Sequence, residues 1–284
     1  MNLDKAILEP FISNALAEDI GDGDHTSLST IPKGQTGKAK LLIKDNGIIA
    51  GIDVSIEIFK AVDATLLIDI LIQDGETVKP GDIAFYVSGS IHSILKAERL
   101  VLNTMQRMSG IASTTNRIVK ILEGTGTKVL DTRKTTPGLR YLEKLAVRIG
   151  GGVNHRFGLY DMILIKDNHV DYAGGISNAI KSAQNYLKEN KINIPVEVEV
   201  RNLEELKEVM QFGQIDRILL DNFSFSLLKE AVKLVNGSYI TEASGGITED
   251  NVLEYANCGV DYVSMGALTH SVKSLDMSLK AVKP

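Results

Sequence analysis

Residues 196–221 read VEVEVRNLEELKEVMQFGQIDRILLD, with two short apolar runs on either side of a helical pattern. The apolar runs lie at 196–200 and 217–220, and the apolar residues of 203–212 recur at helical spacing. Because the connection is long enough for a crossover helix, the pattern is typical of two parallel strands joined by a helix. This stretch therefore predicts a parallel α/β architecture.

The same alternation extends over the C-terminal half of the chain. Six strand-like runs occur in order, at 129–130, 162–165, 196–200, 217–220, 239–241 and 262–264. Helical patterns separate them, at 142–149, 176–187, 203–212, 226–235 and 249–256. The last four strands are spaced by about one compact βα unit each, which favours a barrel or partial barrel over a doubly wound sheet.

The N-terminal part of the chain has a different pattern. Apolar residues between Leu3 and Leu16 recur at helical spacing and predict an opening amphipathic helix. Strand-like runs then occur at 38–44, 48–49, 66–72 and 83–87, with helices expected near 54–62 and at about 93–123. We therefore expect a small antiparallel sheet with a helix packed on it.

The composition limits the class of protein. The 284 residues carry a formal net charge of −5, which argues against a nucleic-acid binder, since such proteins usually have a basic face. The single cysteine, Cys258, excludes an internal disulfide framework and fits a reducing compartment. No apolar run approaches the length of a membrane span, and Met1 to Leu16 lacks a signal-peptide core. We expect a cytoplasmic protein with no membrane partner.

Cationic side chains gather between residues 131 and 169, although the chain is acidic overall. They are Arg133, Lys134, Arg140, His155, Arg156, Lys166 and His169. These residues lie beside turn glycines and apolar runs rather than on one polar helix face, so the cluster predicts a pocket for an anionic small molecule. Within it, Arg140 is interpreted as a surface charge, and His169 either lines the pocket or forms a supporting hydrogen bond. Polar residues follow strand after strand, and a parallel barrel has its active site at those strand ends.

Glycine turns at two neighbouring strand ends predict a phosphate site. Ser244-Gly245-Gly246 follows one strand, and we expect residues 248–250 to form the first turn of the next helix. Backbone N–H groups of such a turn bind phosphate, and Gly266 after the following strand adds a second set on the same side. Two adjacent turns of this kind at a barrel mouth are far more specific than one.

Two acids, Glu199 and Asp221, lie at the ends of neighbouring strands. Near phosphates such carboxylates most often hold Mg²⁺, and the alternative is that they pair with Arg or Lys across the barrel mouth. Glu197 shares the strand face of Glu199 and is a weaker candidate for the same work. The residues fit an enzyme that joins a multiply negative acid to a phosphorylated sugar. A lyase or aldolase with Lys166 as Schiff-base nucleophile, and a non-catalytic binding protein, are the alternatives.

Six ordered motifs resemble those of the quinolinate phosphoribosyltransferase family, and the resemblance covers nearly the whole chain. The motifs are Thr132-Arg133-Lys134-Thr135-Thr136-Pro137-Gly138, Asn154-His155-Arg156, Lys166-Asp167-Asn168-His169, Glu197-Val198-Glu199, Leu220-Asp221-Asn222 and Glu242-Ala243-Ser244-Gly245-Gly246-Ile247. The resemblance implies an N-terminal α/β sandwich domain and an incomplete parallel α/β barrel of about six to seven strands. We place these domains at 1–112 and 113–269, with residues 270–284 packing back onto the first.

The resemblance implies transfer of phosphoribosyl from phosphoribosyl pyrophosphate to quinolinate, with Mg²⁺ as cofactor. The products are nicotinate mononucleotide, pyrophosphate and carbon dioxide, in de novo NAD synthesis. The residues matching those that hold the quinolinate carboxylates are Arg133, His155, Arg156 and Lys166, with Arg99 reaching in from the second subunit of a homodimer. The expected catalytic residues are Lys134 near the pyrophosphate and Glu199 and Asp221 around Mg²⁺ and ribose, and the 5′-phosphate cradle matches Ser244, Gly245 and Gly266.

Rival interpretations within the same fold are a phosphoribosyltransferase that acts on nicotinate and a diverged paralogue associated with molybdenum transport. The large number of cations favours a substrate with two carboxylates over one with a single carboxylate.

Overall fold

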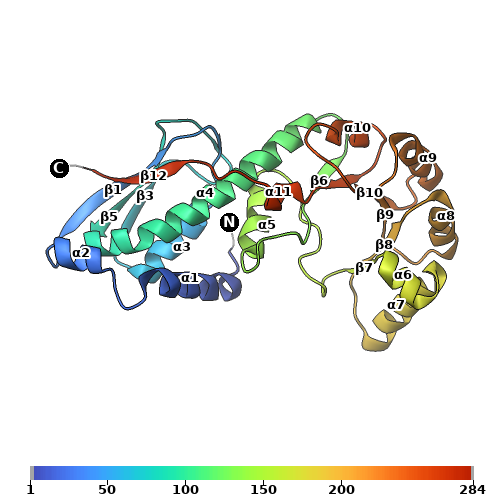
Figure 1. Cartoon of the computed structure of the whole chain (residues 1–284), viewed down its shortest axis with the longest axis horizontal. Coiled ribbons are helices and arrows are strands. Elements are labelled where there is room, and N and C mark those ends of the chain that lie inside the picture. The colour runs from blue at the N-terminus through green and yellow to red at the C-terminus, as the bar shows by residue number, and fades with distance from the viewer. Residues whose placement is uncertain (1–2, 283–284) are drawn as a thin grey trace. The chain divides into compact units, whose positions relative to one another are not determined.

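The computed structural model describes residues 3–282, and the chain divides into two compact units (Figure 1). The sheet unit comprises Met1–Asn116, Thr136–Gly151 and Ser271–Pro284, and the barrel unit comprises Arg117–Thr135 and Gly152–His270. The domain limits expected from the sequence stay predictions. Among the described residues, no helix combines the length and the apolar character that crossing a membrane requires.

An antiparallel sheet of four strands, in the order β12-β1-β5-β3, forms the centre of the sheet unit. The strands are β1 (Thr36–Ile43), β3 (Leu67–Ile70), β5 (Ile83–Ser90) and β12 (Met277–Ala281), and a separate short pair is β2 (Gly47–Ile48) with β4 (Thr77–Val78). Ala39, Leu41 and Ile43 of β1 are buried, because alternate side chains of a strand face the same side. The expected antiparallel sheet is confirmed, and β12 adds a C-terminal edge strand beside β1.

Five helices begin in this unit among the described residues. They are α1 (Lys5–Ile20), α2 (His25–Thr30), α3 (Ile52–Val62), α4 (Ile91–Ile121), whose last residues belong to the barrel unit, and α5 (Arg140–Ile149). The side chains of Asp4 and Asp24 cap α1 and α2 by accepting backbone N–H bonds. On α4, a Cβ at Gly110 would lie 2.3 Å from the backbone oxygen of Lys273. Only glycine therefore allows α4 to approach the C-terminal segment so closely.

Six parallel strands form the sheet of the barrel unit, in the order β6-β11-β10-β9-β8-β7. They are β6 (Lys128–Leu130), β7 (Ile163–Ile165), β8 (Val196–Val200), β9 (Arg217–Asp221), β10 (Ile240–Ser244) and β11 (Tyr262–Ser264). Within the described residues the end strands β6 and β7 do not pair with each other, so the barrel stays open at one place. The sequence predicted an incomplete barrel of six to seven strands, and the structure confirms it with six.

The helices of the barrel unit connect these strands. They are α6 (Asp167–Ala173), α7 (Ile176–Asn190), α8 (Leu203–Phe212), α9 (Phe225–Val235), α10 (Val252–Ala256) and α11 (Ala267–His270). Figure 1 shows α7, α8 and α9 on the outer side of the strands. The side chains of Asn202 and Ser224 cap α8 and α9, which fixes where each crossover helix begins after its strand.

Two local expectations in the barrel unit were wrong. The strand expected at 239–241 runs from Ile240 to Ser244, because Glu242 and Ser244 face the polar interior of the barrel rather than solvent. The helix expected from residue 249 begins only at Val252. Asn251 accepts the N–H of Thr248 at 2.8 Å and donates to the carbonyl of Gly246 at 3.1 Å, and this holds the preceding residues in a loop.

Candidate active site

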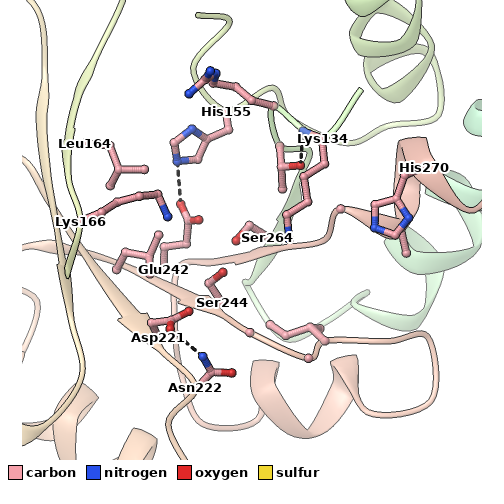
Figure 2. A pocket seen from close by; sticks show the side chains of 18 of the residues that line it. Lys134, His155, Leu164, Lys166, Asp221, Asn222, Glu242, Ser244, Ser264 and His270 are labelled. Carbon is pink, nitrogen blue, oxygen red and sulfur yellow. Dashed lines mark hydrogen bonds and ion pairs between the residues drawn. The ribbon is translucent and has the colours of Figure 1, made fainter. Parts of the chain in front are cut away.

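A cavity of about 580 Å³ opens at the carboxyl ends of the barrel strands (Figure 2). Its lining contains most of the site residues predicted from the sequence, namely Arg133, Lys134, His155, Arg156, Lys166, Asp221, Ser244, Gly245, Gly246 and Gly266. Glu199 is bonded to one lining residue, Lys166, and is itself only 8% exposed. Arg99 lies on α4 in the sheet unit. The barrel fold thus brings together residues that are more than 130 positions apart in sequence, from Arg133 to Gly266.

One end of the cavity is cationic, and we call Arg133, His155, Arg156 and Lys166 the carboxylate lobe. The loop that carries His155 is attached to the end of β6, because the buried carboxylate of Asp131 accepts the backbone N–H of His155 at 2.9 Å. The Arg156 guanidinium donates to the carbonyl of Met162 at 3.3 Å, and burial together with the charge of Arg133 lowers the pKa of Arg156. Like charges held this close favour an anion between them.

The His155 ring contacts two buried acids. Its Nε2 lies 2.8 Å from a carboxylate oxygen of Glu197 and 3.4 Å from one of Glu242. Burial lowers the pKa of His155, but the hydrogen bonds and charges of these two acids outweigh burial and raise that pKa to about 9. Its Nδ1 accepts the backbone N–H of Arg156 at 2.7 Å, a contact that opposes protonation. The two carboxylates have the stronger influence, since both are almost fully buried.

Lys166 and Glu199 form an ion pair, with Nζ 2.8 Å from the carboxylate. Of the two possibilities left open for Glu199, pairing with a cation is therefore present in this structure. An amine in such a pair is poorly placed to attack a carbonyl, which disfavours the Schiff-base alternative. Burial and the charge of Glu199 raise the pKa of Asp221, which also accepts a hydrogen bond from Asn222 at 2.6 Å.

Opposite the carboxylate lobe lies the phosphate lobe, which comprises Ser244, Gly245, Gly246 and Gly266. Gly245 has a φ of +97°, and a Cβ there would lie 2.2 Å from Oδ1 of Asn222. Asn222 itself has a φ of +54° and donates its N–H to the carbonyl of Ser244 at 2.9 Å. Because the helix begins only at Val252, the amides of this lobe come from a loop and not from a helix N-terminus as expected.

Several lining residues had no place in the sequence-based site. Asn222, Ser264 and His270 line the cavity, and Figure 2 shows His270 near Lys134. Their positions in the sequence could have indicated a place in the site. Asn222 follows β9 directly, Ser264 ends β11, and His270 lies one helical turn after Gly266. For His169 the sequence left open a place in the pocket or a supporting hydrogen bond. Its Nδ1 accepts the N–H of Lys166 at 2.9 Å, in the first turn of α6, as the second alternative implies.

A pocket that combines a cationic lobe with a glycine-rich loop at the mouth of a parallel barrel is typical of enzymes acting on phosphorylated anions. Two family descriptions match the chain: "Quinolinate phosphoribosyl transferase, N-terminal domain" over residues 24–109, and the corresponding C-terminal domain over residues 111–280. Together they span most of the sequence. The chain belongs to the quinolinate phosphoribosyltransferase family.

Individual relatives agree with this family. A protein of Nicotiana glauca named "Quinolinate phosphoribosyltransferase [decarboxylating] 2, mitochondrial" is 46% identical over 288 residues, covering 96% of this chain and 82% of its own. The "Probable nicotinate-nucleotide pyrophosphorylase [carboxylating]" of Bacillus subtilis is 43% identical, covering 96% and 92% respectively. The crystal structure of NadC from Streptococcus pyogenes superposes with a TM-score of 0.93 at 38% identity, covering both chains fully (100% each).

Proposed function

We propose that this chain transfers phosphoribosyl from phosphoribosyl pyrophosphate to quinolinate and releases pyrophosphate and carbon dioxide, forming nicotinate mononucleotide for NAD synthesis. One observation supports the proposal most strongly. A single cavity contains both the cationic lobe and the glycine-rich phosphate lobe, and Asp221, at the end of β9, lines the same cavity. Family membership supports the same reaction. The enzyme is thus a pentosyltransferase whose acceptor carries two carboxylates.

The carboxylate lobe is the proposed binding site of quinolinate. Guanidinium groups form paired hydrogen bonds with carboxylates, so Arg133 and Arg156 suit the two acid groups of this substrate. Arg156 is only 8% exposed, and a substrate carboxylate there would compensate a charge that burial disfavours. Nicotinate, with one carboxylate, leaves part of this charge unbalanced. That difference is the proposed basis of specificity.

The phosphate lobe is the proposed site of the ribose 5′-phosphate, and Lys134 the partner of the departing pyrophosphate. A Cβ at Gly266 would lie 3.0 Å from Cδ of Lys134, so the glycine gives this side chain room within the cavity. The carbonyl of Lys134 accepts a bond from the hydroxyl of Thr269 at 2.9 Å, which fixes the backbone from which the side chain extends. A fixed ammonium stabilises the charge that develops on the leaving pyrophosphate.

Asp221 and Glu199 are the proposed partners of Mg²⁺, directly or through water. Asp221 ends β9 and Glu199 lies on the neighbouring strand β8, and burial and the charge of Glu199 raise the pKa of Asp221. A divalent cation would relieve the repulsion between these two acids. When bound, Mg²⁺ supplies charge neutralisation to the pyrophosphate. Two carboxylates leave its remaining positions to phosphate oxygens and water, which is how Mg²⁺ is usually held.

The chemistry needs little acid–base help from the protein. As the bond from ribose C1 to pyrophosphate breaks, the quinolinate nitrogen forms the new bond to C1, and acids near the sugar stabilise positive charge on it. The ring is then a pyridinium. It accepts the electron pair left when the neighbouring carboxylate departs as carbon dioxide, and a proton replaces that group. Placement of the two substrates should therefore dominate the rate.

A homodimer with Arg99 acting in the second subunit's site is part of the proposal. Arg99 and the cavity belong to different compact units, and the family resemblance supplies the cross-subunit role. Mixing two inactive variants, Arg99→Ala and Lys134→Ala, tests it. If Arg99 acts across the interface, mixed dimers contain one site with both residues intact and regain up to about half of the activity per pair. A monomer by light scattering, or no recovery after subunit exchange, contradicts the proposal.

A cytoplasmic location is also proposed, supported by a lone buried thiol at Cys258, which suits a reducing compartment. The Nicotiana glauca relative is named as mitochondrial and an Arabidopsis thaliana relative as chloroplastic. Fractionation of cells that produce the chain, followed by immunodetection, distinguishes these compartments.

The reaction is tested by following nicotinate mononucleotide formation from phosphoribosyl pyrophosphate with quinolinate or with nicotinate, each with and without Mg²⁺. We expect product from quinolinate only, and only with Mg²⁺. Product from nicotinate would keep the phosphate lobe and overturn the proposed role of the carboxylate lobe. No product from either acid would favour the paralogue or the binding protein.

A further inference from the structure

Four charged side chains lie close together inside the barrel, at the carboxylate lobe and behind it, where parallel barrels usually pack apolar layers. They are His155, Glu197, Arg217 and Glu242, and we call them the buried charge network. The side chain of Arg217 is 15% exposed and the other three are 7% exposed or less. Strand register explains the gathering: Glu197 of β8 pairs with Arg217 of β9, and Glu242 of β10 lies on the next strand.

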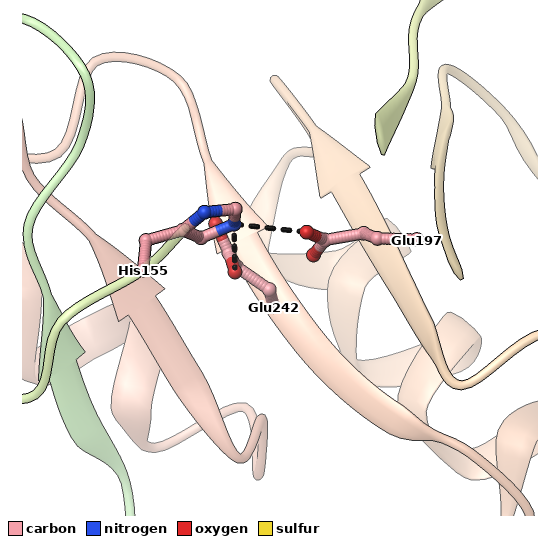
Figure 3. Close-up of side chains that lie close together, drawn as sticks. All are labelled: His155, Glu197 and Glu242. Atoms are coloured by element: carbon pink, nitrogen blue, oxygen red, sulfur yellow. Dashed lines mark hydrogen bonds and ion pairs between the residues drawn. The ribbon is translucent and has the colours of Figure 1, made fainter. Parts of the chain in front are cut away.

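Each acid of the network lies close to both of its basic groups. Figure 3 shows the His155 ring between Glu197 and Glu242, with Nε2 at 2.8 and 3.4 Å from their oxygens. Arg217 lies 3.2 Å from Glu242 and 3.9 Å from Glu197, and its guanidinium stacks 4.8 Å from the centre of the Tyr262 ring. Two acids thus face two basic groups. Buried charges persist only when they are compensated in this way.

A metal site is the other arrangement that these side chains suggest. His155, Glu197 and Glu242 offer three ligand atoms within 4.8 Å of one another. However, Arg217 lies within ion-pair distance of both acids and already supplies the cation that such a cluster needs. A metal ion there would be repelled by the guanidinium. The network is better explained as a support for His155, which lines the cavity.

Both ring nitrogens of His155 are engaged, and the second leads towards the substrate site. Nε2 meets the two buried acids, while Nδ1 lies 2.7 Å from the backbone nitrogen of Arg156. The backbone nitrogen of His155 is bonded to the buried Asp131 at 2.9 Å. The ring is therefore held at both of its nitrogens, and the backbone of His155 is held by Asp131. Any rotation of it would disturb the backbone from which Arg156 extends into the cavity.

We infer that Glu197 and Glu242 are positioning residues for the acid substrate: through the His155 ring they fix the placement of Arg156 and so set the affinity for quinolinate. This inference rests on the proposed function of the same cavity. Glu242 lines the cavity and Glu197 lies behind His155, but the inferred role of both acids is exercised through the His155 ring. The effect of Glu197 should reach the carboxylate lobe only, because Glu197 lies on β8, whereas the phosphate lobe is built on the β10 and β11 loops and on Asn222.

The variant Glu197→Gln tests the inference, because it keeps the shape of the side chain and removes its charge. Hydrogen bonds to charged groups are among the stronger ones in proteins, so we expect KM for quinolinate to rise about tenfold or more when this bond is weakened. We expect KM for phosphoribosyl pyrophosphate to stay within about twofold. The matched control is Glu230→Gln, an exposed acid on α9 of the same unit, which should change neither constant. Unchanged KM for quinolinate, or equal changes for both substrates, overturns the inference.

A double-mutant cycle distinguishes positioning through His155 from general loss of structure. If Glu197 acts through His155, Glu197→Gln should add little to the quinolinate KM of a His155→Ala background, whereas independent effects would multiply. Should Glu197→Gln fail to fold, as judged by circular dichroism, Glu242→Gln completes the same cycle. Wild-type protein that forms no product from quinolinate would overturn the proposed function together with this inference. Active wild type with an unaffected variant overturns the inference alone.

Discussion

The two lobes of the cavity achieve anion binding by different means. The carboxylate lobe is made of side chains, and one of them, His155, is held by acids buried inside the barrel. The phosphate lobe is made of backbone, and its shape depends on a glycine at a φ of +97° that touches Asn222. A lobe made of side chains can lose one contact at a time. A lobe made of backbone depends on its conformation as a whole, so single changes there should have larger effects.

Gly245→Ala should have the largest effect. Its Cβ would lie 2.2 Å from Asn222 Oδ1, and a non-glycine residue at this φ is strained by about 1–3 kcal/mol before phosphate contacts are lost. We expect kcat/KM for phosphoribosyl pyrophosphate to fall at least about a hundredfold. Quinolinate binding, measured by calorimetry, should change little. Gly237→Ala is the control, since it shares a positive φ in the same unit but has open space around it.

Arg133→Ala should come next and should affect the other lobe. Loss of charge-assisted bonds to a substrate carboxylate costs roughly 1.5–3 kcal/mol, so KM for quinolinate should rise about ten- to a hundredfold while the fold persists. Steady-state kinetics with each substrate varied in turn measure this. Near-normal kcat/KM for quinolinate would remove Arg133 from the carboxylate lobe.

Asp221→Asn tests the acid between the lobes. The amide removes one negative charge and keeps the shape, so the Mg²⁺ concentration for half-maximal activity should rise by about tenfold, which corresponds to about 1.4 kcal/mol. Activity is measured over a Mg²⁺ titration with both substrates saturating. An unchanged Mg²⁺ requirement would assign the metal to other groups and leave Asp221 a role at the ribose alone.

The smallest effect should be a pH dependence of stability from His155. Because its pKa rises from 6.5 to about 9 on folding, the stabilisation is complete below about pH 6.5 and is lost as the pH rises through 9. We expect a loss of about 1 kcal/mol, less than the whole shift implies, because the Arg156 N–H opposes the proton. Urea unfolding at steps from about pH 6 to about pH 9.5 measures it. In the His155→Gln variant, this part of the dependence of the unfolding free energy on pH should disappear. The same pH dependence in the variant and the wild type would contradict the assignment.

Much of the cavity could be anticipated because a parallel barrel converts sequence order into a spatial rule. Residues that follow the strands meet at one end of the barrel, and therefore Arg133, Lys166, Asp221 and Ser244 could be grouped from the sequence alone. The short loop before α10 was not anticipated. The loop ends where it does because the Asn251 side chain forms hydrogen bonds with Thr248 and Gly246. Helical periodicity in the sequence does not predict these bonds.

The sequence by itself determined the strand and helix order, the incomplete parallel barrel, the glycine turns and the family, because each of these depends on local periodicity or on contiguous motifs. Only the tertiary structure decided the partners of the buried charges. Glu197 gave no sign in sequence of the distant His155, Arg217 and Glu242 that it meets. Charge pairing inside a barrel depends on register between strands, and register is fixed by packing of the whole sheet rather than by any one segment.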